Sequence, residues 1–126
     1  MGEALATTLA DLSALAYERR GAGALKALIH RTDDVQVSVY VLEPGGRIAR
    51  HRHTAAWDIS FVIEGEIEAR FGEAGGARSV RCRPQAVNLV PPGQAHEIVN
   101  ASATQPAKFL LIQSPARGFD FVAAPS

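Results

Sequence analysis

Three histidines and one aspartate in the middle of the chain are spaced so that they could bind a metal ion. His51 and His53 are separated by one residue, Asp58 follows five residues after His53, and His96 comes from a second stretch further along. Because side chains alternate between the two faces of an extended strand, His51 and His53 are expected on the same face. Three imidazoles and a carboxylate suit Mn, Fe, Ni, Cu or Zn. The spacing therefore predicts a site for one divalent transition metal ion; the alternative is a chance His-x-His on an exposed strand.

The residues around these histidines form two motifs. The first runs from Gly45 to Gly65 as Gly-x5-His-x-His-x4-Asp-x6-Gly, and the second from Gln85 to Asn100 as Gln-x5-Pro-x-Gly-x2-His-x3-Asn. Both spacings match the motifs of the cupin superfamily, which the chain resembles. There are two departures, because Asp58 stands where the family usually has Glu and Gln85 where it usually has Gly. The resemblance implies an all-β fold, a small antiparallel jelly-roll (cupin) barrel with a short N-terminal arm or helix.

The role of Asp58 is open at this point. Aspartate is shorter than glutamate by one carbon–carbon bond, about 1.5 Å. Its carboxylate could bind the metal directly, bind it through a water, or leave an open coordination position of the kind that catalytic sites keep. We expect a core of three histidines with Asp58 at or just beyond bonding distance, where it could also serve as a general base.

Four further residues are candidates for the substrate pocket. Tyr40, Trp57 and Ser60 are placed near the motifs by the sequence, although each could equally be a packed or hydrogen-bonded core side chain. Arg117 ends a Ser-Pro-x-Arg stretch that is similar to the ending of some sugar-acid-processing cupins. Those relatives carry Asp and Phe in the preceding strand, where this chain has Leu111 and Gln113, so the resemblance does not extend to that activity.

Two arginines next to the histidines are expected to point the other way. Arg50 and Arg52 alternate with His51 and His53, so strand geometry places them on the opposite face. We expect that face to be solvated or to contact another subunit.

Composition excludes several classes of partner. Thirteen basic and thirteen acidic side chains cancel, so no overall field attracts nucleic acid or an anionic membrane. Nothing approaches the ~18 consecutive apolar residues of a membrane span. The single cysteine, Cys82, fits a reducing compartment, and Glu3 and Asp11 argue against a secretory signal. We expect a cytoplasmic protein.

The order of patterns along the chain predicts an arm over residues 1–24, a barrel over 25–114 and a tail over 115–126. Leu5, Leu9 and Leu12 recur at helical spacing in the arm, and Phe119 and Phe121 in the tail should pack on the barrel or on a second subunit. We therefore expect a homodimer. Alternating apolar residues and Gly/Pro turns predict strands at 25–30, 35–42, 47–53, 58–64, 66–71, 78–83, 86–90, 96–100 and 108–113.

The resemblance implies a small metal-binding cupin that acts on a small organic ligand inside the barrel. We expect a metal-dependent, dioxygenase- or isomerase-like enzyme, with oxygenation, isomerisation, decarboxylation and lyase chemistry all open. Two other classes also remain open: a non-catalytic small-molecule binding or sensor cupin, and a metal-free cupin similar to sugar epimerases (RmlC-like). His30 lies outside both motifs and receives no role.

Overall fold

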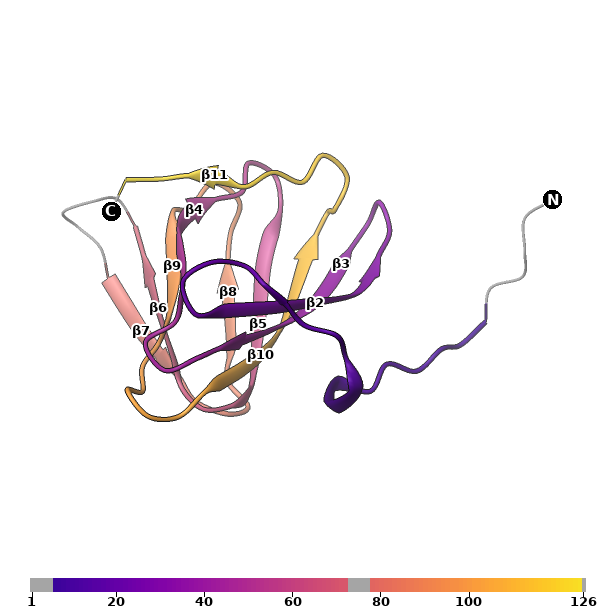
Figure 1. Cartoon of the computed structure of the whole chain (residues 1–126). Helices are drawn as coiled ribbons and strands as arrows, with labels where there is room; N and C mark the ends of the chain where they lie inside the picture. Colours follow the sequence, from indigo (N-terminus) through magenta and orange to yellow (C-terminus); the bar gives the residue numbers. More distant parts are fainter. Residues whose placement is uncertain (1–5, 73–77, 126) are drawn as a thin grey trace.

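The chain folds into two antiparallel β-sheets that face one another (Figure 1). The structure, a computed structural model, describes residues 6–72 and 78–125. The expected all-β barrel is confirmed, and all nine predicted strands are present with no end shifted by more than one residue. The elements are η1 (Leu12–Ala14), β1 (Glu18–Arg19), β2 (Ala24–Arg31), β3 (Gln36–Leu42), β4 (Arg47–Arg52), β5 (Trp57–Glu64), β6 (Ile67–Phe71), β7 (Arg78–Cys82), β8 (Val87–Val90), β9 (His96–Asn100), β10 (Ala107–Ser114) and β11 (Val122–Ala123).

Strand order brings together segments that are far apart in the sequence. One sheet has the order β1-β2-β3-β10-β5-β8, and the other has the order β11-β4-β9-β6-β7. The strand of the first motif, β4, therefore lies beside the strand of the second motif, β9, and His51 pairs directly with His96. Asp58 comes from β5 in the facing sheet. The two sheets thus supply the candidate ligands from opposite sides.

The core fills the space between the two sheets. Along β10 every second residue is buried, which is the period-2 pattern of a strand with one face in the interior. Phe109 and Leu42 from the larger sheet and Ile67 and Ile98 from the smaller one are almost completely buried. This apolar core occupies one part of the barrel, and the polar site lies beside it.

A bulge in β4 sets the direction of the ligands. The register between β4 and β9 shifts between Ile48 and His51, so one extra residue is inserted on β4. Ile48 and His51 both line the interior cavity, although an odd separation would place them on opposite faces of a regular strand. Arg50, next to the bulge, is buried rather than solvated, and neither its Nε nor its Nη2 has a hydrogen-bond partner among the described residues. The expectation of a solvated face is therefore wrong for Arg50.

The two ends of the chain differ from the simple picture of an arm and a tail. The predicted helix is only the three-residue η1, and Leu9 is 93% exposed; Leu5 lies outside the described residues. A lone exposed turn has no apolar face to pack, so the arm stays extended. The strands β1 and β11, which the patterns did not predict, extend the two sheets. In the described residues no helix is long and apolar enough to cross a membrane.

Gln85, which stands where the family's second motif usually has glycine, adopts a glycine-like backbone conformation. Its backbone has a φ of 77°, the left-handed conformation that favours glycine. The turn before β8 thus keeps the shape that the family's glycine would give, at a cost of about 1–2 kcal/mol for a non-glycine residue.

Candidate metal centre

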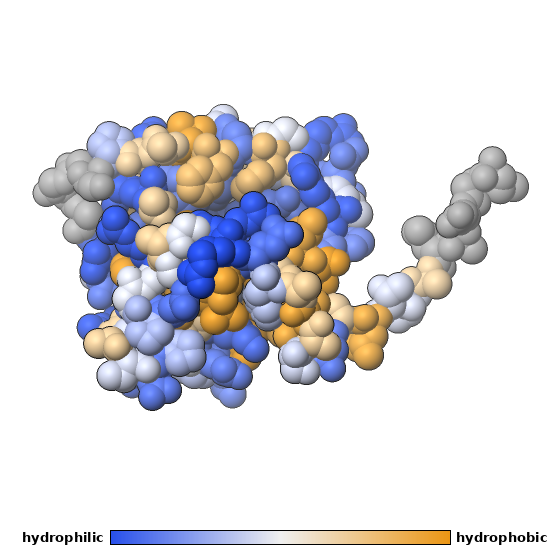
Figure 2. Space-filling model, in the orientation of Figure 1, coloured by the Kyte–Doolittle hydropathy of each residue, from blue (hydrophilic) through white to orange (hydrophobic). Residues whose placement is uncertain are grey.

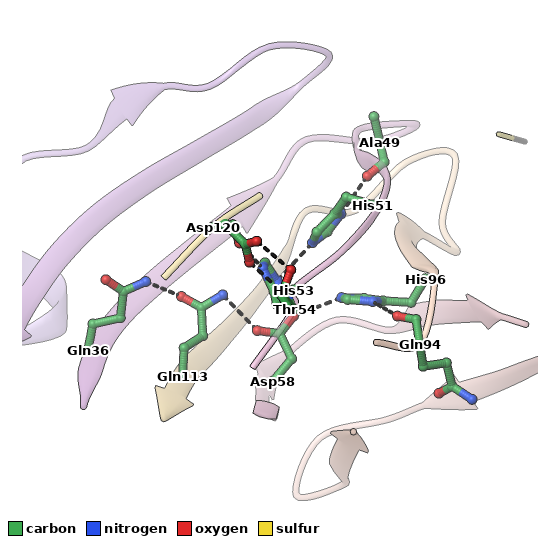
Figure 3. A network of polar contacts seen from close by, with 10 residues as sticks. All are labelled: Gln36, Ala49, His51, His53, Thr54, Asp58, Gln94, His96, Gln113 and Asp120. Carbon is green, nitrogen blue, oxygen red and sulfur yellow. Dashed lines mark hydrogen bonds and ion pairs between the residues drawn. The ribbon is translucent and has the colours of Figure 1, made fainter. Parts of the chain in front are cut away.

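The structure brings all four predicted ligands into one buried cluster. His51 lies on β4, His53 is the first residue after that strand, Asp58 lies on β5 and His96 begins β9. One ligand atom from each residue lies within 4.8 Å of the others, and all four side chains are buried. Figure 3 shows them converging from different strands. The cluster has the size and composition of a site that could hold one metal ion.

The outer nitrogen of each histidine is held by a backbone carbonyl. Nδ1 of His51 lies 2.7 Å from the Ala49 carbonyl, that of His53 lies 2.6 Å from the Asp120 carbonyl, and that of His96 lies 3.0 Å from the Gln94 carbonyl. Because a carbonyl can only accept, these contacts assign the proton of each neutral ring to Nδ1. Such contacts to the far nitrogen are how proteins orient metal-binding imidazoles. A neutral ring of this tautomer turns an unprotonated Nε2 inward, and only a protonated ring can donate a hydrogen bond from Nε2.

The inward-facing atoms form a cluster of acceptors. Nε2 of His51 lies 3.2 Å from Nε2 of His53, and Nε2 of His96 lies 2.8 Å from Oδ2 of Asp58. Asp58 Oδ2 also lies 3.4 Å from His53 Nε2. Four buried electron-pair donors facing one another need either extra protons or a cation between them. The donor set fits a divalent transition ion.

The Asp58 carboxylate is ionised and oriented. Burial alone would raise its pKa, but hydrogen bonds to His53 and His96 and their charge hold the pKa of Asp58 well below its usual range. Its second oxygen, Oδ1, accepts a 2.7 Å hydrogen bond from Gln113 Nε2. Gln113 Oε1 accepts in turn from Gln36 Nε2, as Figure 3 shows. This amide chain leaves Oδ2 free for the histidine cluster.

Two histidines have opposite pKa shifts in the metal-free protein. Burial, and then the charge of His96, lower the pKa of His51 to about 4. Burial also acts to lower the pKa of His53, but hydrogen bonds to Asp58 and to the Asp120 carbonyl raise it by more, so it lies above its ordinary value. Without a metal, the cluster therefore holds His51 neutral and favours a proton on His53.

The C-terminal tail forms one wall of the site. The Phe121 ring stacks on His51 with centroids 4.0 Å apart, and Phe119 lies 4.7 Å from His53. The Asp120 side chain accepts hydrogen bonds from the backbone and hydroxyl of Thr54, which fixes the tail over the loop after β4. The tail thus packs on its own barrel. Only its two phenylalanines signalled this in the sequence; nothing there pointed to Asp120, Gln36 or Gln113.

A cavity leads from the cluster to the surface. Its inner part, about 50 Å³, is lined by His51, His53 and Asp58, and it adjoins an outer part of about 550 Å³. Tyr40 lines both parts, as the sequence suggested. Ser60 is buried between the sheets but lines neither part. The structure does not bring Trp57 or Arg117 to the cavity, because Trp57 is 44% exposed and Arg117 pairs with Asp33 at 3.0 Å.

Comparison with known proteins identifies the family. Residues 38–113, more than half of the chain, match the family described as "Cupin domain". The chain belongs to the cupin family. No curated protein matches this cupin.

Solved structures support the same fold. An uncharacterized conserved protein with a double-stranded β-helix domain from Klebsiella pneumoniae is 24% identical, with a TM-score of 0.74 over 93% of this chain and 98% of its own. KdgF from Halomonas sp. is 17% identical, with a TM-score of 0.75 over 89% and 96%. The oxalate decarboxylase of Lactobacillus farciminis is 16% identical, with a TM-score of 0.72 over 89% of this chain and 34% of its own. At these identities the likeness establishes the fold.

Proposed function

We propose that this cupin is a metal-dependent enzyme that acts on a small organic molecule inside its barrel. The observation that carries the proposal is the convergence of three inward-facing histidine nitrogens and one carboxylate oxygen at the inner end of an open cavity. A structural metal site is closed by protein ligands on all sides, whereas a catalytic site keeps access for a further ligand. The neighbouring cavity supplies that access.

Some residues of the site would hold the ion, and others form the walls of the cavity in which the reaction would take place. His51, His53 and His96 would hold the ion, which when bound would act as a Lewis acid or as a template for the substrate. Phe119, Phe121 and the other apolar lining residues give the inner cavity apolar walls beside the candidate ligands. The depressed pKa of Asp58 makes it a weak base, which supports a ligand role for this residue over the general-base role.

The related structures support a small-molecule substrate. One structural neighbour is an oxalate decarboxylase captured as a formate complex, and its name states that it acts on a small organic acid. Among the reaction classes implied by the family, we propose isomerisation, decarboxylation or lyase chemistry, each of which needs a positioned Lewis acid. Oxygenation remains open, because two histidines and a carboxylate also suit ferrous iron.

The experiment that tests this function is elemental analysis of protein purified without a histidine tag and without added metal. We expect one divalent transition ion per chain. Protein that contains no transition metal, and that does not take up zinc, manganese or ferrous iron on titration, would overturn the proposal and favour the metal-free class.

We also propose that the protein is a homodimer located in the cytoplasm. Because the tail packs on its own barrel, the surface that supports a dimer is the outer face of the larger sheet. Phe61, Val87 and Leu89 are 39%, 52% and 59% exposed there, on the adjacent strands β5 and β8. Exposed apolar residues grouped in this way mark interaction surfaces. The buried free thiol of Cys82 is consistent with a reducing compartment.

A further inference from the structure

The outer part of the cavity is lined by positive charge. Arg20, Lys26 and Arg47 all line it, and none of its lining residues, all of which lie in the described parts of the chain, is acidic. Figure 2 shows hydrophobic residues along the edge that carries β11 and strongly hydrophilic residues across the middle of the same face. A cavity with cationic groups on one side and apolar groups on the other favours a ligand with an anionic end and an apolar body.

Of the cationic side chains that line the cavity, Lys26 is the one that lines both the inner part, beside the candidate metal centre, and the outer part. It extends from β2, and its Nζ lies 5.6 Å from the centre of the Tyr40 ring. In the described residues neither the Lys26 ammonium nor the Tyr40 hydroxyl has a hydrogen bond or an ion pair. Burial, and then the charge of Arg20, lower the pKa of Lys26 by more than the charge of Asp58 raises it.

The side chains of Arg20 and Arg47 are held in place less firmly than that of Lys26. Arg20 lies 3.4 Å from Glu18, and both side chains are more than half exposed, so this ion pair is weak. Arg47 is exposed and has no ion pair among the described residues. Both can therefore turn toward an anion in the outer cavity, while Lys26 and Tyr40 are already placed at its junction with the inner part.

We propose that this cavity recognises the carboxylate of a small organic acid through Lys26 and Tyr40, with Arg20 and Arg47 attracting it at the mouth. This inference rests on the proposed function and names its substrate class. An ammonium and a phenolic hydroxyl that line the same cavity can give a carboxylate two hydrogen bonds, one of them charge-assisted. The body of the acid would lie along Ile48, Phe119 and Phe121, which line both parts of the cavity and lead to the histidines.

The test compares the affinities of zinc-loaded protein for two probes that have the same shape and different charge. Benzoate and benzamide are titrated calorimetrically into the wild type, Lys26→Met and Lys108→Met, and zinc content is measured on every sample. Lys108 is the matched control, since it is the only other lysine and lies on β10 among the residues that alternate away from the core. Inorganic phosphate is titrated as a third probe.

We expect the wild type and Lys108→Met to bind benzoate about tenfold more tightly than benzamide, as for one charge-assisted hydrogen bond. Lys26→Met should lose this preference while keeping its zinc, and added salt should reduce the preference in the wild type. Equal binding of the two probes by zinc-loaded wild type, or a preference that survives Lys26→Met, would overturn the inference alone. Tighter binding of phosphate than of benzoate would contradict the carboxylate assignment and would indicate a phosphate ester as the ligand. Failure to bind zinc would instead count against the proposed function.

Discussion

Gln113 lies directly opposite Asp58 on the neighbouring strands β10 and β5, and its Nε2 donates a 2.7 Å hydrogen bond to Asp58 Oδ1. Both side chains are buried, so this contact fixes the orientation of the carboxylate in the interior. Gln36, opposite Gln113 on β3, continues the chain of amides. The three strands thus set which oxygen of Asp58 faces the histidines.

The first prediction concerns this support. Gln113→Leu should lower zinc affinity by about 10–100-fold, as is typical when the partner of a metal ligand is lost. It should also lower the free energy of unfolding by about 1–3 kcal/mol, because Gln36 then lacks its buried acceptor. Calorimetric zinc titration and urea unfolding measure the two effects. Gln105→Leu, at an exposed position, is the matched control and should change neither.

The second prediction concerns Asp58 itself. The sequence favoured three histidines with Asp58 at or just beyond bonding distance, whereas the structure places its Oδ2 2.8 Å from His96 Nε2, inside the cluster. We therefore predict direct ligation. Asp58→Ala should weaken zinc binding more than Gln113→Leu does, since it removes a ligand and the negative charge that offsets the cation. A metal–Oδ2 distance of about 2.0–2.2 Å in a crystal structure would confirm this, and a water between the two would contradict it.

The sequence revealed the ligands because each lies in a motif with fixed local spacing, whereas the residues that support them are brought in by strand pairing at long range. His51 and His53 share a face through strand alternation alone, and the alternating apolar residues predicted the strands around them. The contact of Gln113 with Asp58 depends on the register between β5 and β10, which lie far apart in the chain. The buried position of Arg50 follows from the bulge in β4, and no residue type in that stretch signals an inserted residue.

The third prediction separates the metal ligands from the other histidine. His51→Ala and His96→Ala should each abolish the binding of one transition ion per chain, because each removes an inward-facing Nε2 from the cluster. His30→Ala should retain the ion, because His30 is exposed on β2, away from the cavity. Elemental analysis of the three purified variants measures this. Equal metal retention in all three would refute the assignment.

The fourth prediction tests the outer face of the larger sheet as the dimer surface. Leu89→Lys should convert the protein to a monomer, because a dimer that buries this apolar face would have to bury the new charge as well. Val122→Lys is the control: Val122 is also an exposed apolar residue on a strand, 41% exposed, but it lies on β11 at the edge of the other sheet. Light scattering at micromolar concentration gives the mass of each. A monomeric wild type would contradict the homodimer.

The last prediction is a pH dependence of the metal-free protein. The pKa of His51 is about 4 when folded and about 6.5 when unfolded. Between these values the unfolded chain binds a proton that the folded chain does not, so stability should fall as the pH is lowered from about 6.5 to about 4. The expected loss is about 2–3 kcal/mol.

His53 has its pKa raised, so its contribution to stability is fully present below about pH 6.5 and is lost only as the pH rises above that value. Asp58 has its pKa lowered, so its contribution is lost only as the pH falls below about 4. Stability should therefore be greatest near pH 6.5.

Urea unfolding of chelator-treated protein across this pH range measures the free energy of unfolding. His51→Gln should flatten the decline between pH 6.5 and 4, whereas His30→Gln should leave it in place; an unchanged decline in His51→Gln would show that another group causes it.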